Sequence, residues 1–185
     1  MTVPVCREPR GPAGALLSEP PARREVTLKT DPAVQTSMRV SVIGGGRVTD
    51  EEYATARELG RVLGERSHEV VCGGRGGVME AVCRGASEAG GHTIGILPGD
   101  RPDAANEYVD TPVVTGLGNA RNVLVVLNGD AVVAVDGGPG TLSELGHALD
   151  LGKPVAGLDT HRVEGLPIEH VETPVEAVEY IEARA

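Results

Sequence analysis

Four glycine-rich segments hold the residue types in this sequence that are best suited to bind an anion. They are residues 44–46, 73–77, 115–119 and 137–141, and a helical pattern follows each of them. Glycine lets the backbone approach a ligand closely and adopt positive φ. The free N–H groups and the dipole at a helix N-terminus favour a negative charge there. The predicted contacts to a phosphate or nucleotide are Gly44, Gly45, Gly46, Gly73, Gly74, Gly76, Gly77, Asn119, Gly137, Gly138, Gly140 and Thr141.

Short apolar runs precede these turns and decide where the turns lie in the fold. The run at 131–135 (AVVAV) is apolar throughout, as expected of a strand that is buried on both faces. Strands are predicted over 39–43, 69–72, 93–97, 112–115, 131–135, 154–158 and 168–171. Helices are predicted over 50–66, 78–89, 120–127, 141–151 and 174–183.

Strands that alternate with helices predict parallel βαβ units with right-handed crossovers. The expected fold class is therefore α/β: a doubly wound, mostly parallel, Rossmann-like three-layer sandwich. In such a sheet every βα turn lies at the carboxyl edge, and ligands bind there near the switch point of the strand order. The glycines of any one turn could serve only to close it tightly. Four such turns on one edge favour phosphate binding.

Two common nucleotide motifs are missing from these turns. A P-loop needs Gly-Lys-Ser/Thr, and no lysine lies in any of the four segments. The dinucleotide fingerprint GxGxxG lacks its last glycine in residues 44–49, and no acidic residue ends the second predicted strand. NAD is therefore not expected. A metal site is not expected either, because the sequence has no CxxC or HxxxH spacing.

Two longer segments resemble a known superfamily. Residues 73–99 (GGRGGVMEAVCRGASEAGGHTIGILPG) and 116–155 (GLGNARNVLVVLNGDAVVAVDGGPGTLSELGHALDLGKPV) are similar to the SLOG or Lonely Guy Rossmann-fold superfamily, often labelled "lysine decarboxylase-like". This superfamily includes cytokinin-activating phosphoribohydrolases and molybdenum cofactor carrier proteins. The chain looks most like an uncharacterised branch near the carrier proteins, from Met38 to about Gly157. The resemblance implies a nucleoside monophosphate or related phosphate at the GGxGT turn, and a homo-oligomer.

The resemblance also implies two catalytic residues. In the hydrolase branch an arginine and the glutamate of the PGGxGTxxE motif carry the chemistry, and they correspond to Arg121 and Glu144. A carboxylate can stabilise the oxocarbenium character that develops when an N-glycosidic bond breaks, and can orient a water. An arginine can hold phosphate or polarise the leaving base. The alternatives are a surface ion pair for Arg121 and a charge that complements the helix dipole for Glu144.

Two departures from the hydrolase pattern keep two functions open. Asp136 replaces a proline and would put negative charge beside the phosphate, and Asn122 follows Arg121 where a basic residue is usual. One function is a phosphoribohydrolase that releases free base and ribose 5-phosphate from a nucleoside 5′-monophosphate. The other is a non-catalytic binding or carrier protein for a nucleotide or a pterin-type ligand like the molybdenum cofactor. Whether the protein is an enzyme therefore stays open at this point.

The label "lysine decarboxylase" does not fit the residues. A pyridoxal phosphate (PLP) enzyme needs a lysine in its site to form a Schiff base. The only lysine after residue 37 is Lys153, which is predicted before a strand, at the edge opposite the glycine turns. We therefore expect no PLP, and no cofactor is required for either function.

Composition narrows the partners and the compartment. The net charge of −10 repels a nucleic-acid backbone, so a phosphorylated small molecule is the expected partner. No apolar run is long enough to span a membrane, and three cysteines without framework spacing suit a reducing cytoplasm. Residues 1–37 hold six of the 13 prolines and are predicted to be a disordered tail, with translation from Met38 as the alternative. Residues 38–185 are the predicted Rossmann-like nucleotide-binding domain.

Overall fold

The computed structural model describes residues 37–185, so the predictions for residues 1–36 lie outside the described residues. Seven strands and five α-helices follow one another along the described part of the chain. The strands are β1 (Arg39–Gly44), β2 (Glu69–Cys72), β3 (Thr93–Leu97), β4 (Thr111–Val114), β5 (Ala131–Val135), β6 (Val155–Leu158) and β7 (Glu169–Val171). The helices are α1 (Asp50–Glu65), α2 (Val78–Glu88), α3 (Asn122–Leu127), α4 (Pro139–Asp150) and α5 (Pro174–Glu182).

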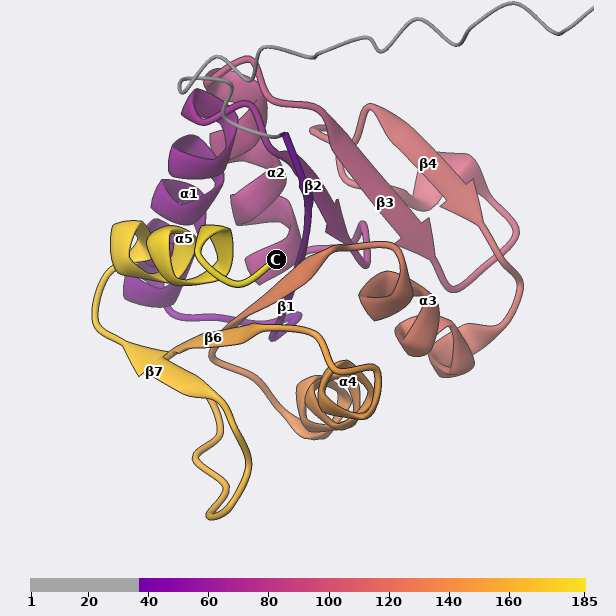
Figure 1. Ribbon diagram of the computed structural model, residues 1–185. Helices are drawn as coiled ribbons and strands as arrows, with labels where there is room; N and C mark the ends of the chain where they lie inside the picture. The colour runs from indigo at the N-terminus through magenta and orange to yellow at the C-terminus, as the bar shows by residue number, and fades with distance from the viewer. Residues whose placement is uncertain (1–36) are drawn as a thin grey trace, which may run out of the picture. The chain divides into compact units, whose positions relative to one another are not determined.

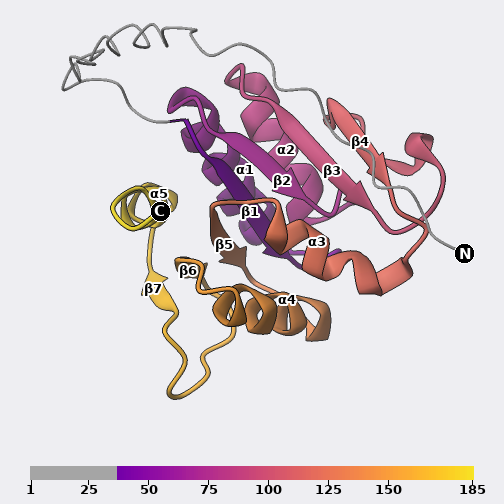
Figure 2. The ribbon, with the colours of Figure 1, turned by 45° about the vertical axis from the view of Figure 1, so that its right-hand side comes forward.

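The strands form one sheet in the order β4-β3-β2-β1-β5-β6-β7, and every pair is parallel. The chain adds β2 to β4 on one side of β1 and then returns to add β5 to β7 on the other side. The switch point of the strand order therefore lies between β1 and β5. Helices α1, α2 and α5 cover one face of the sheet, and α3 and α4 cover the other (Figures 1 and 2). The predicted doubly wound α/β fold is confirmed.

The core consists of two aliphatic layers separated by the sheet. Along β5, Val133 and Val135 pack in the layer under α1, α2 and α5, whereas Val132 and Ala134 pack in the layer under α3 and α4. Successive side chains of a strand point to opposite faces, so a strand between two helical layers needs an apolar residue at every position. This explains the sequence of the central strand and fixes the carboxyl ends of β1 and β5 rigidly beside each other.

The N-termini of the helices differ in how their free N–H groups are satisfied. Helix α1 has a capping box, in which Thr49 accepts from the N–H of Glu52 and the Glu52 carboxylate accepts from the N–H of Thr49. Helix α4 begins at Pro139 after Gly138, and no side chain caps it. The first turn of α4 therefore keeps free donors, and it lies at the switch point.

Two structural details refine the sequence prediction. The segment before α3 is a short 3-10 helix, Gly118–Arg121, so Arg121 is the last residue of this turn. Helix α4 starts two residues earlier than the predicted 141–151, because proline is well suited to the first helical position.

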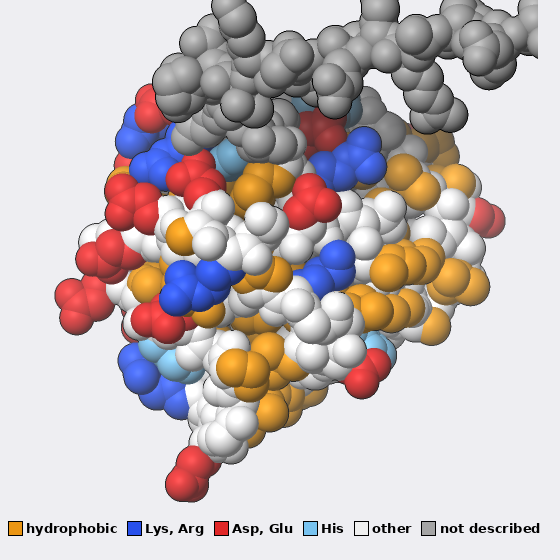
Figure 3. Space-filling model, in the orientation of Figure 1, with side chains coloured by type: hydrophobic (Ala, Val, Ile, Leu, Met, Phe, Trp, Pro, Cys, Tyr) orange, Lys and Arg blue, Asp and Glu red, His pale blue; other side chains and the backbone are white. Residues whose placement is uncertain are grey.

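Surface properties bear on the remaining expectations. Within residues 37–185, no helix is both long and apolar enough to cross a membrane. Exposed apolar side chains gather over β4 and α3 in Figure 3, and they include Val113, Val114, Leu117 and Leu127. The expected homo-oligomer stays a prediction.

Candidate functional site

A pocket of about 290 Å³ lies at the carboxyl edge of the sheet, where β1 and β5 end. All four predicted glycine turns contribute to its wall, together with the start of α3 and the first turns of α4. The residues that line it are Val42, Ile43, Gly44, Gly45, Gly46, Gly73, Met79, Asn119, Arg121, Asn122, Gly138, Gly140, Thr141 and Glu144. The position matches the place where doubly wound sheets bind ligands.

The N-terminus of α4 supplies hydrogen-bond donors to this pocket. Leu142 N–H donates to the carbonyl of Gly138 at 3.1 Å, so the amides of Gly140 and Thr141 come before the first bond of the helix. Pro139 has no N–H, so the donors that the first turn of α4 offers to a ligand are those of the residues after it. Thr141 is buried, and its side chain lies directly against Gly137, where φ is +134°. The arrangement suits a phosphate held by backbone N–H groups and the helix dipole.

Arg121 crosses the pocket between two of the glycine turns. Its side chain is 9% exposed and makes three contacts: Nη1 donates to Asn122 Oδ1 at 2.7 Å and to Glu144 Oε1 at 3.5 Å, and Nη2 donates to Gly73 O at 3.4 Å. Within residues 37–185, its Nε is the one buried side-chain nitrogen or oxygen without a hydrogen-bond partner. Burial lowers the pKa of Arg121 although the charge of Glu144 opposes this. A largely buried cation that lines the pocket and is incompletely hydrogen-bonded is well placed to attract an anion.

Glu144 faces Arg121 from the second turn of α4. Burial raises the pKa of Glu144 to about 7, and the Arg121 charge opposes this rise without cancelling it. The 3.5 Å contact is too long to compensate for desolvation of the two groups. The carboxyl group therefore divides between its acid and carboxylate forms near neutral pH, which suits a group that donates or accepts a proton.

The predicted site residues fall into two groups. Eight of the predicted binding residues line the pocket with Arg121 and Glu144, namely Gly44, Gly45, Gly46, Gly73, Asn119, Gly138, Gly140 and Thr141. The other four, Gly74, Gly76, Gly77 and Gly137, do not line it. Gly77 packs against the backbone of Gly45 and Gly46, and a methyl group on Gly74 would lie 2.7 Å from Leu97 Cδ2. These two glycines allow the neighbouring turns to approach each other.

The sequence did not predict three features of the site. Asn122 fixes one end of Arg121, and Met79 from α2 supplies an apolar side chain to the wall. Asp136 lines a separate hollow with Thr49 and Asp159, on the other side of the β1 turn. Asp136 does not line the pocket, but its carboxylate lies against Gly45, which does: a methyl group on Gly45 would be 2.8 Å from Asp136 Oδ2. The expected negative charge beside the phosphate site therefore stays a prediction.

Two further residue sets bear on cofactors. Lys153 lies just before β6, at the amino edge, where Nζ donates to the carbonyl of Gly129. A Schiff-base lysine is thus not among the residues of the pocket. Within residues 37–185, no group of three His, Cys, Asp or Glu side chains is placed to hold a metal ion.

Comparisons with known proteins agree with this architecture. The sequence profile of the SLOG cluster4 family matches residues 37–183. An uncharacterized protein of Archaeoglobus fulgidus is 43% identical over 144 residues, which are 77% of this chain and 93% of that protein. The molybdenum cofactor binding protein from the phototrophic bacterium Rippkaea orientalis has a similar structure, with a TM-score of 0.75 and 34% identity over 80% of this chain and 97% of that one.

A hydrolase is similar over a shorter length. A probable cytokinin riboside 5′-monophosphate phosphoribohydrolase of Oryza sativa subsp. japonica is 36% identical over 93 residues, which are 49% of this chain and 38% of that protein. The superfamily resemblance read from the motifs is confirmed, including the closeness to the molybdenum cofactor proteins. Since the profile covers nearly all of the described residues, the chain belongs to the SLOG cluster4 family.

Proposed function

We propose that the protein binds a nucleoside 5′-monophosphate in the pocket and hydrolyses its N-glycosidic bond, without a cofactor. The observation that carries this proposal is the Arg121–Glu144 pair. Both side chains are 9% exposed, their contact is loose at 3.5 Å, and both line the pocket beside the free donors of α4. A pair that only stabilised the fold would be expected to have its donors satisfied.

The proposed reaction assigns a task to each part of the pocket. The N-terminus of α4 holds the 5′-phosphate at Gly138, Gly140 and Thr141. As the C1′–N bond breaks, its electron pair goes to the base, and the sugar gains oxocarbenium character. The carboxylate form of Glu144 stabilises that charge and takes a proton from the attacking water. A proton then reaches the base, and the products are free base and ribose 5-phosphate. Arg121, whose side chain lines the pocket, holds the phosphate or the sugar with its guanidinium.

The experiment mixes purified protein with a panel of nucleoside 5′-monophosphates and measures free base by chromatography. Glu144→Gln should reduce base release by about 100- to 1,000-fold, in the range for losing one group that stabilises the transition state. It should keep nucleotide binding, measured by calorimetry. Glu164→Gln, which changes an exposed glutamate of another loop, is the matched control and should keep full turnover. Base release that survives Glu144→Gln unchanged rules out this mechanism.

A carrier function is the second candidate. The structural similarity to the Rippkaea orientalis molybdenum cofactor binding protein, which extends over 97% of that chain, supports it. Asn122 also supports it. This residue stands where the hydrolase pattern has a second basic residue, and its Oδ1 accepts a hydrogen bond from Arg121 Nη1. The same panel separates the two functions. A ligand that raises the melting temperature and stays bound through gel filtration, without base release, makes the protein a carrier of a phosphorylated ligand.

A further inference from the structure

The loop that follows β6 reaches back to the turn that precedes α4. Thr160 Oγ1 donates to the carbonyl of Asp136 at 2.7 Å, and Thr160 is 8% exposed. His161 Nε2 lies 3.1 Å from the carbonyl of Gly138. Because a carbonyl oxygen only accepts hydrogen bonds, Nε2 must carry the proton. Neither side chain lines the pocket, so any effect of the two residues on a ligand must pass through the turn.

We propose that Thr160 and His161 are positioning residues: they hold two carbonyls of the turn between Asp136 and Thr141 so that its N–H groups are preorganised for a phosphate. The proposal rests on the proposed function, because it assumes that a phosphate binds to this turn. It adds a second loop, after β6, to the residues that determine affinity.

The backbone of the turn needs such support. Asp136 has φ of +50° without being glycine, a conformation that persists only when its surroundings hold it. Its N–H donates to Leu158 O at 3.0 Å and its carbonyl accepts from Thr160, so both adjoining peptide groups are tied to the end of β6 and the loop after it. In a planar trans peptide the N–H points opposite to the carbonyl. Holding the Asp136 carbonyl therefore fixes the direction of the Gly137 N–H, and with it the backbone that leads into Gly138, which lines the pocket.

Two further contacts support the turn: His161 contacts the carbonyl of Gly138 at the start of α4, and Gly157 packs against Thr160. The Gly138 carbonyl already accepts from Leu142 N–H, and His161 adds a second donor on the same oxygen. This sets the angle at which the first turn of α4 leaves the loop. Gly157 in β6 leaves room for Thr160, because a methyl group at residue 157 would lie 2.6 Å from Thr160 Cγ2. The two residues therefore connect β6 with the anion-binding turn.

The test measures binding of inorganic phosphate and of AMP by calorimetry, and steady-state kinetics with AMP wherever turnover occurs. Thr160→Val removes the donor and keeps the shape, and should raise Kd for both ligands about tenfold, as expected for loss of preorganisation. Thr160→Ser keeps the hydroxyl and should restore Kd to within about threefold. His161→Ala, at a half-exposed position, should raise Kd by about threefold. KM should rise more than kcat falls, a split that general loss of folded protein would not produce.

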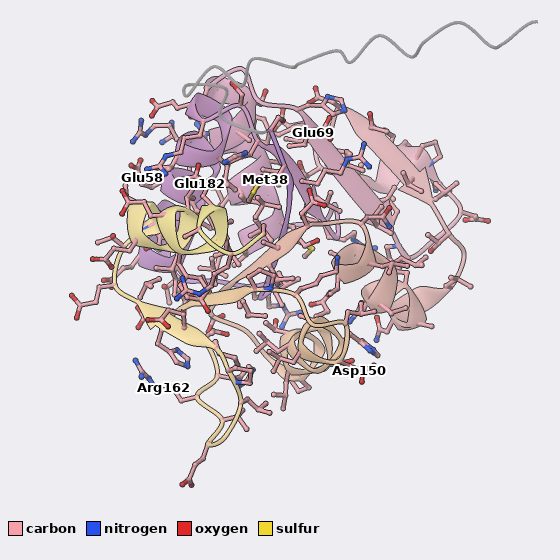
Figure 4. The ribbon with its side chains drawn as sticks, viewed as in Figure 1. Met38, Glu58, Glu69, Asp150, Arg162 and Glu182 are labelled. Atoms are coloured by element: carbon pink, nitrogen blue, oxygen red, sulfur yellow. The ribbon has the colours of Figure 1, made fainter. Side chains whose placement is uncertain are left out.

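Two further variants complete the test. Gly157→Ala should reproduce Thr160→Val, because it displaces the threonine from behind. Arg162→Ala removes an exposed side chain of the same loop (Figure 4) and should leave Kd unchanged. If Thr160→Val does not fold, His161→Ala and Gly157→Ala test the proposal instead: an unchanged Kd for phosphate and AMP in both variants overturns it.

The outcomes separate the two proposals. If Thr160→Val binds phosphate and AMP with the same Kd as the wild type, this inference is overturned and the proposed function is unaffected. Thr160→Ser that binds as weakly as Thr160→Val also overturns it, since the hydroxyl is then irrelevant. A wild-type protein that binds neither phosphate nor AMP overturns both proposals.

Discussion

Two clusters of charged side chains, one partly buried and one buried, lie at opposite edges of the sheet, and they are built differently. At the amino edge, Glu182 of α5 accepts from Arg66 at 2.6 Å and from His68 at 2.8 Å. His68 also accepts from the N–H of Met38, so Met38 and Glu182, both labelled in Figure 4, contact the same imidazole. At the carboxyl edge, Arg121 and Glu144 meet only at 3.5 Å, and Arg121 Nε has no partner.

The pKa shifts of the two glutamates express this difference. Burial alone would raise the pKa of Glu182, but the hydrogen bond from His68 and the charge of Arg66 outweigh it, and the pKa is lowered. At Glu144 burial prevails over Arg121, and the pKa rises to about 7. A well-satisfied cluster holds the C-terminal helix to the sheet. An under-satisfied cluster in a pocket is typical of a site whose remaining partner is a ligand.

The largest expected effect is the loss of ligand affinity when Arg121 at the carboxyl edge is replaced. Arg121→Gln removes the charge that meets the ligand and should weaken AMP binding about 100-fold, equivalent to about 2.7 kcal/mol. Isothermal titration calorimetry measures it, with circular dichroism to verify the fold. Arg75→Gln, at an exposed arginine outside the pocket, should change Kd by less than about threefold. If Arg121→Gln binds AMP with the same Kd as the wild type, Arg121 and Glu144 do not form a ligand-binding site.

The second effect is a pH dependence of stability in the ligand-free protein. A carboxyl group whose pKa is about 7 when folded and about 4.3 when unfolded binds its proton more tightly in the native state. Its contribution is fully present below about pH 4 and is lost as pH rises through 7. Relative to Glu144→Gln, the wild type should lose roughly 2 kcal/mol of unfolding free energy between pH 5 and 8. Urea unfolding of both proteins measures this, and a constant difference across that range would contradict it.

The third effect belongs to the amino edge. Glu182→Gln should lower the free energy of unfolding by about 1.5 kcal/mol, because it weakens charge-assisted hydrogen bonds from Arg66 and His68. It should leave AMP affinity unchanged, measured alongside thermal unfolding. A loss of affinity with unchanged stability would show that the division between a structural and a functional cluster is mistaken.

The smallest effect tests how closely Arg121 is packed. A methyl group on Gly73 would meet Arg121 Nη2, and would lie 2.7 Å from Met79 Sδ. Both are ends of flexible side chains, so Gly73→Ala should fold and weaken AMP binding about fivefold by displacing the guanidinium. Gly99→Ala is the matched control, because a methyl group there meets no atom within 4 Å. Binding by Gly73→Ala at the wild-type level would mean that Arg121 moves without consequence.

The elements were predictable because their signals are local. Strands β2, β3 and β5 have the predicted bounds, since each is a short apolar run closed by a turn. The position of the glycine turns at the carboxyl edge followed from strand alternation. The strand order, and with it the switch point between β1 and β5, came only from the structure. Arg121 and Glu144 came from motif resemblance, and the structure brings them together in one pocket.

The rest of the site depends on contacts between distant segments. Thr160 and His161 lie 24 and 23 residues after the residues whose carbonyls they contact, in a loop without periodicity. No pattern in the sequence distinguishes Gly73, which lines the pocket, from Gly74, which packs against Leu97.

The pairing of β1 with β5 also has a kinetic side. Val40 pairs with Ala131, so this contact closes a loop of about 90 residues, whereas β1 and β2 join residues only 30 apart. Distant pairings carry a larger entropic cost and form late when folding is limited by topology. The pocket lies where β1 and β5 end, and residues from both halves of the chain line it. A ligand bound there contacts both halves of the chain, and should therefore slow unfolding by stabilising the native state.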